Sequence, residues 1–332
     1  MIHSTASEAA LHALIAAREA AEVGDLNKVV VYTSAQAHMC VEKGVSALGH
    51  GRSSCRLIPV DDNFRMRADL LEAAIRRDLE DGLTPIAVSA SIGTTSTSSV
   101  DPVPEIADIC ERYKLWLHID AAYAGPCAML PEKREYFAGV ERADSIALNP
   151  HKWMFAPMDL TVFYTSQPEA FRKALSMQKE YLPADPHSRA VNFMEYAIPL
   201  GRRFRGLKLW FIMRSYGRDG ITANLREHIR LADDLSDKVD AHPEFERLAP
   251  TQFSLVCFRY KPAGESEDDL NAINEKLMND VNKTGEFFLS NTVLTGKFAV
   301  RVAIGNIHTD QACLDRLWAT ILRLASSAPV AG

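Results

Sequence analysis

The chain has 332 residues, 47% of them hydrophobic, which gives room for about two domains and enough apolar side chains for a sizeable core. A formal net charge of −6 argues against a surface that binds nucleic acid or an anionic membrane. The six cysteines have no paired spacing, and neither a membrane-spanning apolar run nor a signal-peptide pattern is found, so we expect a cytoplasmic protein without a zinc site or disulfide framework.

The first two thirds of the sequence alternate between predicted helices and predicted strands. A helix is expected from about Thr5 to Gly24, because apolar residues recur at helical spacing between a capping hydroxyl and a glycine. Short apolar runs predict strands at 28–33, 56–60, 85–91, 115–119, 145–148 and 160–164. This alternation predicts an α/β fold with a parallel, doubly wound sheet, in which ligands collect at the carboxyl ends of the strands.

The remainder of the chain has a different pattern. A polar stretch from about 177 to 193 contains two prolines and has no clear period, which is typical of a surface loop. Beyond residue 209, predicted helices at 222–239, 267–284 and 310–325 alternate with predicted strands at 253–260 and 298–303. This part is expected to form a small α+β domain.

Two residues with distinctive chemistry follow predicted strands. Asp120 ends a buried run, and Lys152 lies in the turn 149–153 after the strand 145–148. An acid at the end of a buried strand needs a cationic partner, whereas a lysine becomes a nucleophile when burial beside other cations lowers its pKa. A lysine on a solvated turn would be the ordinary interpretation of Lys152 alone. The pair instead favours pyridoxal phosphate, which needs a lysine for its aldehyde and an acid for its ring nitrogen.

Three motifs, in the same order, resemble the pyridoxal-phosphate-dependent group II decarboxylases, and within them the aromatic L-amino acid decarboxylases. They are His118-Ile119-Asp120-Ala121-Ala122-Tyr123-Ala124-Gly125, Asn149-Pro150-His151-Lys152-Trp153 and Ile198-Pro199-Leu200-Gly201-Arg202-Arg203-Phe204-Arg205. The resemblance runs from Met1 to the last predicted helix. It implies a fold-type I enzyme with a large cofactor domain over 1–208 and a small α+β domain over 209–332. The implied cofactor is pyridoxal phosphate, and the implied reaction converts an aromatic L-amino acid to its amine and carbon dioxide.

The resemblance also implies catalytic roles for particular side chains. Lys152 would hold the cofactor aldehyde, and Asp120 would keep the ring nitrogen protonated. His38 would stack on one face of the ring while Ala122 packs on the other. Tyr181 matches a catalytic tyrosine on a mobile loop and would protonate the α-carbon, so that amine is formed in preference to aldehyde.

Further residues are implied to bind the cofactor. Ala6 and Ser7, at the start of the first predicted helix, match the segment that holds the phosphate, consistent with the free N–H groups of a helix N-terminus. Thr95 matches a threonine in the active site. Asn149 and His151 flank the lysine turn, where His151 would help bind the phosphate or tune Lys152. No metal ligand is implied, and the arginines near residue 203 are expected to anchor a helix.

The family carries a long segment before the position that matches Met1, which contributes helices that clasp the partner subunit. We therefore expect an N-terminally truncated homodimer with its active site at the interface, a weakened dimer and low or absent activity. Another fold-type I enzyme, such as an aminotransferase, desulfurase or aldehyde synthase, would share Asp120 and Lys152, although His151 favours a decarboxylase. A non-catalytic homologue or dimerisation remnant is the other alternative. Met39 and Cys40 also depart from the small hydroxyl residues that usually follow His38.

Overall fold

The computed structural model describes residues 1–177 and 191–326. It contains two compact units, Met1–Thr94 with Val100–Ser215 and Thr95–Ser99 with Tyr216–Gly332. The division therefore falls a few residues after the expected boundary at 208/209, within helix α7 (Gly206–Ala241), where Gly217 has the non-helical φ of 61°. Nothing in the local sequence pattern predicted that Thr95–Ser99 would group with the second unit.

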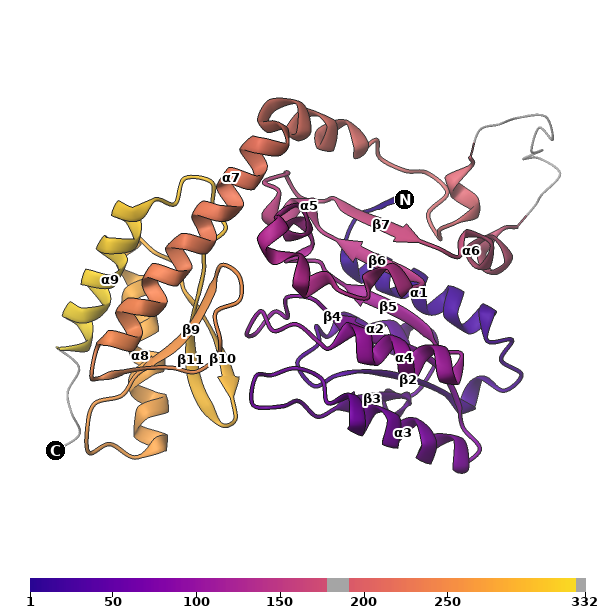
Figure 1. Ribbon diagram of the computed structural model, residues 1–332, viewed down its shortest axis with the longest axis horizontal. Helices are drawn as coiled ribbons and strands as arrows, with labels where there is room; N and C mark the ends of the chain where they lie inside the picture. The colour runs from indigo at the N-terminus through magenta and orange to yellow at the C-terminus, as the bar shows by residue number, and fades with distance from the viewer. Residues whose placement is uncertain (178–190, 327–332) are drawn as a thin grey trace. The chain divides into compact units, whose positions relative to one another are not determined.

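The first unit is built on a seven-stranded sheet with the order β1-β7-β6-β5-β4-β2-β3 (Figure 1). Its strands are β1 (Ile2–His3), β2 (Val29–Ser34), β3 (Cys55–Ile58), β4 (Thr84–Ser91), β5 (Trp116–Asp120), β6 (Ser145–Leu148) and β7 (Thr161–Thr165). Strands β2 to β6 are parallel, whereas β7 is antiparallel to both β6 and β1. The predicted parallel-rich α/β sheet is confirmed. Since β1 and β6 are both antiparallel to β7, they run in the same direction.

Helices of the first unit pack in groups on this sheet. They are α1 (Ala6–Ala20), α2 (Cys40–Ala47), α3 (Ala68–Glu80), α4 (Val103–Tyr113), α5 (Pro150–Trp153) and α6 (Pro168–Leu175). Helix α1 packs with α2 and α6, whereas α3 packs with α4. The buried face of α1 is rich in alanine, which allows close approach to strand residues such as Val31 and Phe163. This close packing fixes the N-terminus of α1 with respect to the strands.

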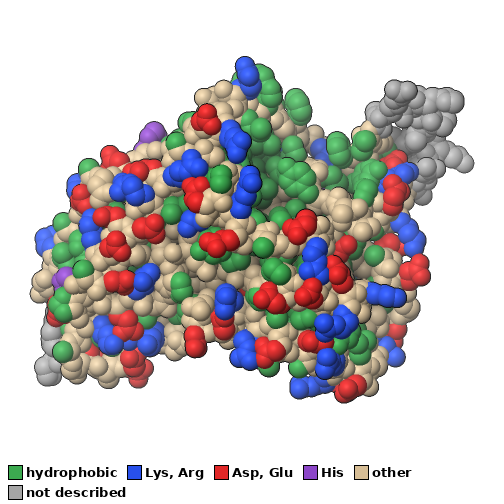
Figure 2. All heavy atoms as spheres, in the orientation of Figure 1, with side chains coloured by type: hydrophobic (Ala, Val, Ile, Leu, Met, Phe, Trp, Pro, Cys, Tyr) green, Lys and Arg blue, Asp and Glu red, His purple; other side chains and the backbone are tan. Residues whose placement is uncertain are grey.

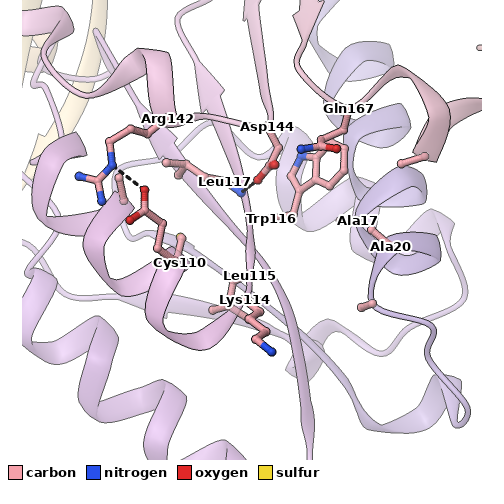
Figure 3. A pocket seen from close by; sticks show the side chains of 14 residues that line it. Ala17, Ala20, Cys110, Lys114, Leu115, Trp116, Leu117, Arg142, Asp144 and Gln167 are labelled. Atoms are coloured by element: carbon pink, nitrogen blue, oxygen red, sulfur yellow. Dashed lines mark hydrogen bonds and ion pairs between the residues drawn. The ribbon is translucent and has the colours of Figure 1, made fainter.

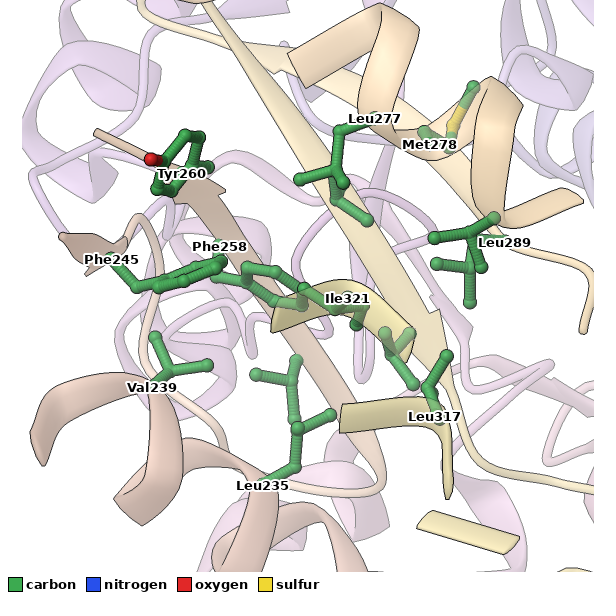
Figure 4. Close-up of a cluster of buried hydrophobic side chains, with 14 of the residues drawn as sticks. Leu235, Val239, Phe245, Phe258, Tyr260, Leu277, Met278, Leu289, Leu317 and Ile321 are labelled. Atoms are coloured by element: carbon green, nitrogen blue, oxygen red, sulfur yellow. The ribbon is translucent and has the colours of Figure 1, made fainter. Parts of the chain in front are cut away.

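The second unit has its own antiparallel sheet, with the order β10-β11-β9-β8. Its strands are β8 (Phe245–Arg247), β9 (Leu255–Tyr260), β10 (Ser290–Leu294) and β11 (Lys297–Ala303), and its helices are the second part of α7, α8 (Glu267–Lys283) and α9 (Gln311–Ala325). Apolar side chains from these helices meet Phe245 and Phe258 of the sheet in one core (Figure 4). The predicted small α+β unit is therefore present.

Two further properties concern the surface and the thiols. Among the described helices, none combines the length and the apolar character that crossing a membrane requires. All six cysteines are free; five are buried, and Cys313 in α9 is partly exposed.

Candidate active site

Topology brings the predicted site residues to one edge of the large sheet. Asp120 is the last residue of β5, and Lys152 lies in α5, directly after β6. Helix α1 begins directly after β1, which runs in the same direction as β5 and β6. The carboxyl ends of all three strands therefore lie at the same edge, where α/β sheets bind their ligands.

Asp120 presents its carboxylate at this edge. Its Oδ1 accepts a hydrogen bond of 2.9 Å from the backbone N–H of Ala122, and no donor to Oδ2 is found among the described residues. The alanine turn is tied to β6, because the N–H of Ala121 donates to Ala147 and the N–H of Asn149 donates to Ala122. One oxygen of a well-positioned carboxylate therefore remains for a cationic N–H donor.

Two glycines allow the loops at this edge to approach one another. A Cβ on Gly93, which has a φ of +85°, would lie 2.7 Å from the Cβ of Ala124. A Cβ on Gly125 would lie 2.6 Å from the Cβ of Leu148. Because real Cβ atoms do not approach so closely, a side chain at either position would push the turn after Asp120 away from its neighbours.

Lys152 lies on a single helical turn that aromatic packing holds in place. Pro150 and Trp153 are the buried residues of α5, and the indole of Trp153 stacks on Tyr123 with ring centroids 4.8 Å apart. The side chain of Lys152 itself is exposed. A one-turn helix that buries Pro150 and Trp153 leaves Lys152 outside its packed face, and its role toward the cofactor aldehyde stays a prediction.

Residues beside Lys152 are also fixed by polar contacts. Buried Asn149 accepts a hydrogen bond of 2.6 Å at Oδ1 from the hydroxyl of Thr161 in β7. The Nδ1 atom of His151 lies 2.6 Å from the oxygen and 2.9 Å from the nitrogen of Leu160. Burial lowers the pKa of His151. The backbone of Leu160 therefore holds this ring, and Nε2 is the nitrogen that remains for a ligand.

His38 belongs to the same electrostatic group as Asp120 and Lys152. Partial burial lowers the pKa of His38; the charge of Lys152 lowers it further, whereas the carboxylate of Asp120 raises it. The N–H of Cys40 donates to His38 Nδ1 at 3.2 Å, so the imidazole proton is on Nε2 in the neutral ring. His38 therefore lies within range of the charges of Asp120 and Lys152, two of the other three residues with predicted catalytic roles.

The start of α1 offers free backbone donors. The hydroxyl of Thr5 accepts from the N–H of Glu8 at 3.3 Å, whereas the N–H groups of Ala6 and Ser7 have no acceptor in the described part of the chain. Although burial alone would raise the pKa of Glu8, hydrogen bonds from His3 and Ser4 hold it well below the usual range. Two unpaired N–H groups at a helix N-terminus fit a phosphate.

Two predicted site residues are not placed with this group. Thr95 is exposed and belongs to the second unit, where its carbonyl oxygen accepts a hydrogen bond from the guanidinium of Arg301. Its role toward the cofactor stays a prediction. Tyr181 lies outside the described residues.

Sequence reasoning missed several supports of the site. The contacts of Thr161 with Asn149 and of Leu160 with His151 join residues about ten positions apart across a turn, which local periodicity does not reveal. The aromatic residues Tyr123 and Trp153 were visible within the quoted motifs. Because both motifs follow strands of the same sheet, these two aromatic residues could have been predicted to stack on each other.

A cavity of about 340 Å³ lies elsewhere in the first unit (Figure 3). Leu115, Trp116 and Leu117 line it at the amino end of β5, together with Lys114 and Asp144. None of the predicted catalytic or cofactor residues in the described part of the chain lines this cavity. It is therefore separate from the edge that carries Asp120 and Lys152.

The chain is similar in sequence to known proteins. The model of the pyridoxal-dependent decarboxylase conserved domain matches residues 1–261. Phenylacetaldehyde synthase from Arabidopsis thaliana is 39% identical, over 98% of this chain and 68% of its own length. Tyrosine decarboxylase 4 from Petroselinum crispum is 38% identical, over 96% of this chain and 65% of its own length.

The chain is also similar to solved structures. Oryza sativa TDC, solved with PLP and tryptamine, superposes with a TM-score of 0.95 at 34% identity, over 98% of this chain and 70% of that one. The chain spans about two thirds of the length of the curated relatives it matches. By the extent of the domain match and by its similarity to these relatives, the chain belongs to the pyridoxal-dependent decarboxylase family.

Proposed function

We propose that this protein is a pyridoxal-phosphate-dependent carboxy-lyase that converts an aromatic L-amino acid to the corresponding amine and carbon dioxide. The observation that carries the proposal is the meeting of Asp120, Lys152 and the N-terminus of α1 at one edge of the sheet. The substrate class is supported by relatives named for tyrosine decarboxylation and by a structural neighbour solved with tryptamine.

The residues at this edge fit the polar groups of the cofactor. Asp120 has an oxygen available for the ring N–H, and the N–H groups of Ala6 and Ser7 are available for the phosphate. Lys152 supplies the amine for the aldehyde, and the methyl group of buried Ala122 suits contact with a ring face. When bound, pyridoxal phosphate supplies an electron sink for the pair left behind by carbon dioxide.

The side chains of this chain would divide the remaining work. Asp120 keeps a proton on the ring nitrogen by charge, because an adjacent carboxylate favours the cationic form of that group. Lys152 would hold the cofactor by its aldehyde, because its side chain ends in a nucleophilic amine. His38, with its Nε2 proton set by the contact between Nδ1 and Cys40, orients the bound ring, and Tyr181 delivers a proton to the α-carbon of the product.

A labelling experiment tests the central assignment. Borohydride reduction of the purified protein followed by peptide mapping should place a pyridoxyl group on Lys152, and the Lys152→Ala variant should carry none. Lys43→Ala is the matched control, because the charge of Lys43 also acts on His38 and the variant should keep its label. Labelling of a different lysine would falsify the assignment.

A second candidate product is the aldehyde, because a relative at 39% identity is named phenylacetaldehyde synthase. Retention of His38 and Tyr181 favours amine. Incubation with tyrosine, tryptophan, DOPA and phenylalanine, with amine, aldehyde and peroxide measured in parallel, separates the two outcomes. Peroxide formed in step with aldehyde would assign the synthase reaction, and a preference for glutamate would exclude the aromatic substrate class.

A second copy of this chain is the proposed protein partner. Large apolar side chains are exposed around the start of α7: Met158, Phe204, Leu207, Trp210 and Phe211 (Figure 2). Four of them line a cavity of about 430 Å³, together with the cations Arg203, Arg205 and Lys208 and the anion Asp159. An exposed apolar patch with a charged rim is typical of a protein interface.

A further inference from the structure

Two buried histidines and two partly exposed charged residues form a polar group at the N-terminal part of α1. This group, the histidine cluster, consists of His3, Glu8, His12 and Arg202. The side chains of His3 and His12 are both 0% exposed, and their rings stack with centroids 4.7 Å apart. Glu8 Oε1 lies 3.5 Å from His3 Nδ1, and Arg202 Nη2 lies 3.5 Å from the same atom.

The histidine cluster joins segments that are far apart in the sequence. His12 Nε2 accepts a hydrogen bond of 2.9 Å from the N–H of Ile198. Arg202 donates a hydrogen bond of 2.6 Å to the carbonyl of Ile2 in β1. His3 also makes an edge contact with Phe163 of β7. Strand β1, helix α1 and the stretch 198–202 are therefore held together through two imidazole rings and one guanidinium.

A metal ion is a poor occupant for this group. Ligand atoms of His3, Glu8 and His12 lie within 4.8 Å of one another. However, the two rings face each other with an interplanar angle of 23°, so their in-plane lone pairs do not converge on one point. His12 Nε2 already accepts from Ile198, and the guanidinium of Arg202 adds a positive charge beside His3. The arrangement suits two neutral imidazoles.

Adding a proton to this group would break one of its contacts. A protonated imidazole has donors at both nitrogens, so His12 could no longer accept from Ile198. Of the charged groups that act on the rings, the Met1 amine and Arg202 are cationic, and Glu8 is the anion. Arg205 acts on Arg202 and adds a further positive charge. Burial lowers the pKa of both histidines, to about 4 for His12.

We infer that the histidine cluster is an acid-sensitive latch that keeps β1, the start of α1 and the stretch 198–202 in place only while both imidazoles are neutral. Ala6 and Ser7 follow β1 directly and belong to the first turn of α1. The consequence for the cofactor rests on the proposed function. Release of the latch would misplace these phosphate donors, so acidification would expel the cofactor.

The sign of the effect follows from linkage. Well above pH 6.5, His12 binds no proton in either state and the latch contributes fully to stability. Below that pH the unfolded chain takes up a proton that the folded site rejects, so stability is lost as pH falls from 6.5 toward 4. Between pH 7.5 and 5, one such histidine shifts the unfolding equilibrium by about 30-fold.

The test replaces His12 by glutamine, whose side-chain oxygen can accept from Ile198 without titrating. Wild type and His12→Gln, as purified, are compared between pH 7.5 and 5 for retained cofactor absorbance and for urea unfolding. The variant should hold cofactor to lower pH. The change in its unfolding constant between pH 7.5 and 5 should be about 30-fold smaller than the change in wild type. His228→Gln, a buried histidine of the second unit, is the matched control and should leave the cofactor profile as in wild type.

Identical pH profiles of cofactor retention and unfolding in wild type and His12→Gln would overturn the latch. If neither protein holds cofactor at pH 7.5, the proposed function fails, and the unfolding comparison still decides the latch. His3→Gln is the second variant, should His12→Gln not fold, and the same flattening of the unfolding profile is expected from it.

Discussion

At the scale of single residues, Asp120 carries the sharpest expectation. Asparagine at this position is nearly isosteric and can keep the hydrogen bond from the N–H of Ala122. It removes the negative charge that would stabilise a protonated ring nitrogen. Asp120→Asn should therefore lower kcat by on the order of 100-fold or more, the scale of losing one preorganised electrostatic partner. The thermal midpoint should change little.

Steady-state rates at saturating cofactor, with thermal unfolding in parallel, measure this prediction. Glu111→Gln is a suitable control, because Glu111 is an exposed carboxylate paired with Arg142 away from this edge. If Asp120→Asn turned over substrate as fast as wild type, Asp120 would not be the partner of the ring nitrogen. A collapsed thermal midpoint would instead assign Asp120 a structural role.

At the scale of elements, the packing of turns against strand ends decides whether the site forms. Gly125 follows β5, and a Cβ there would meet the Cβ of Leu148 in β6 at 2.6 Å. Gly125→Ala should cost about 1–3 kcal/mol of unfolding free energy, as overpacking usually does, and should weaken cofactor binding. Gly24→Ala is the control, because nothing lies within 4 Å of the added methyl group. Urea unfolding and cofactor titration measure both variants; a Gly125→Ala protein as stable as wild type would show that the turn can shift freely.

Local sequence patterns predicted most strands of the large sheet but not the contacts between distant segments. Alternating apolar runs predicted β2 to β7 because each strand is a local feature with its own period. Strand β1 was missed because two residues carry no period, and it is defined by pairing with β7 across the chain. The exposure of Lys152 follows from which face of a one-turn helix packs, and the contact of His12 with Ile198 depends on tertiary structure. The motifs identified Asp120 and Lys152 as candidate site residues. Only the directions of the strands show that the two residues lie at the same edge of the sheet.

At the scale of the whole molecule, the exposed apolar side chains around the start of α7 predict association. Leu207→Glu places a charge in this surface and should shift the molecule toward monomer, with the dissociation constant raised at least about tenfold. Sedimentation velocity over a concentration series measures the change. Leu79→Glu on α3 is the control, because Leu79 is a similarly exposed leucine on another element. Equal sedimentation of both variants and wild type would place any interface elsewhere.

The distribution of thiols gives the two units separate spectroscopic reporters. Burial raises the pKa of the Cys40 thiol to about 12, and four other cysteines are buried, so a maleimide dye should react first at Cys313 on α9. Its fluorescence would follow the second unit while the absorbance of a bound cofactor follows the first. A single denaturation run could then tell whether the two halves melt together or in sequence.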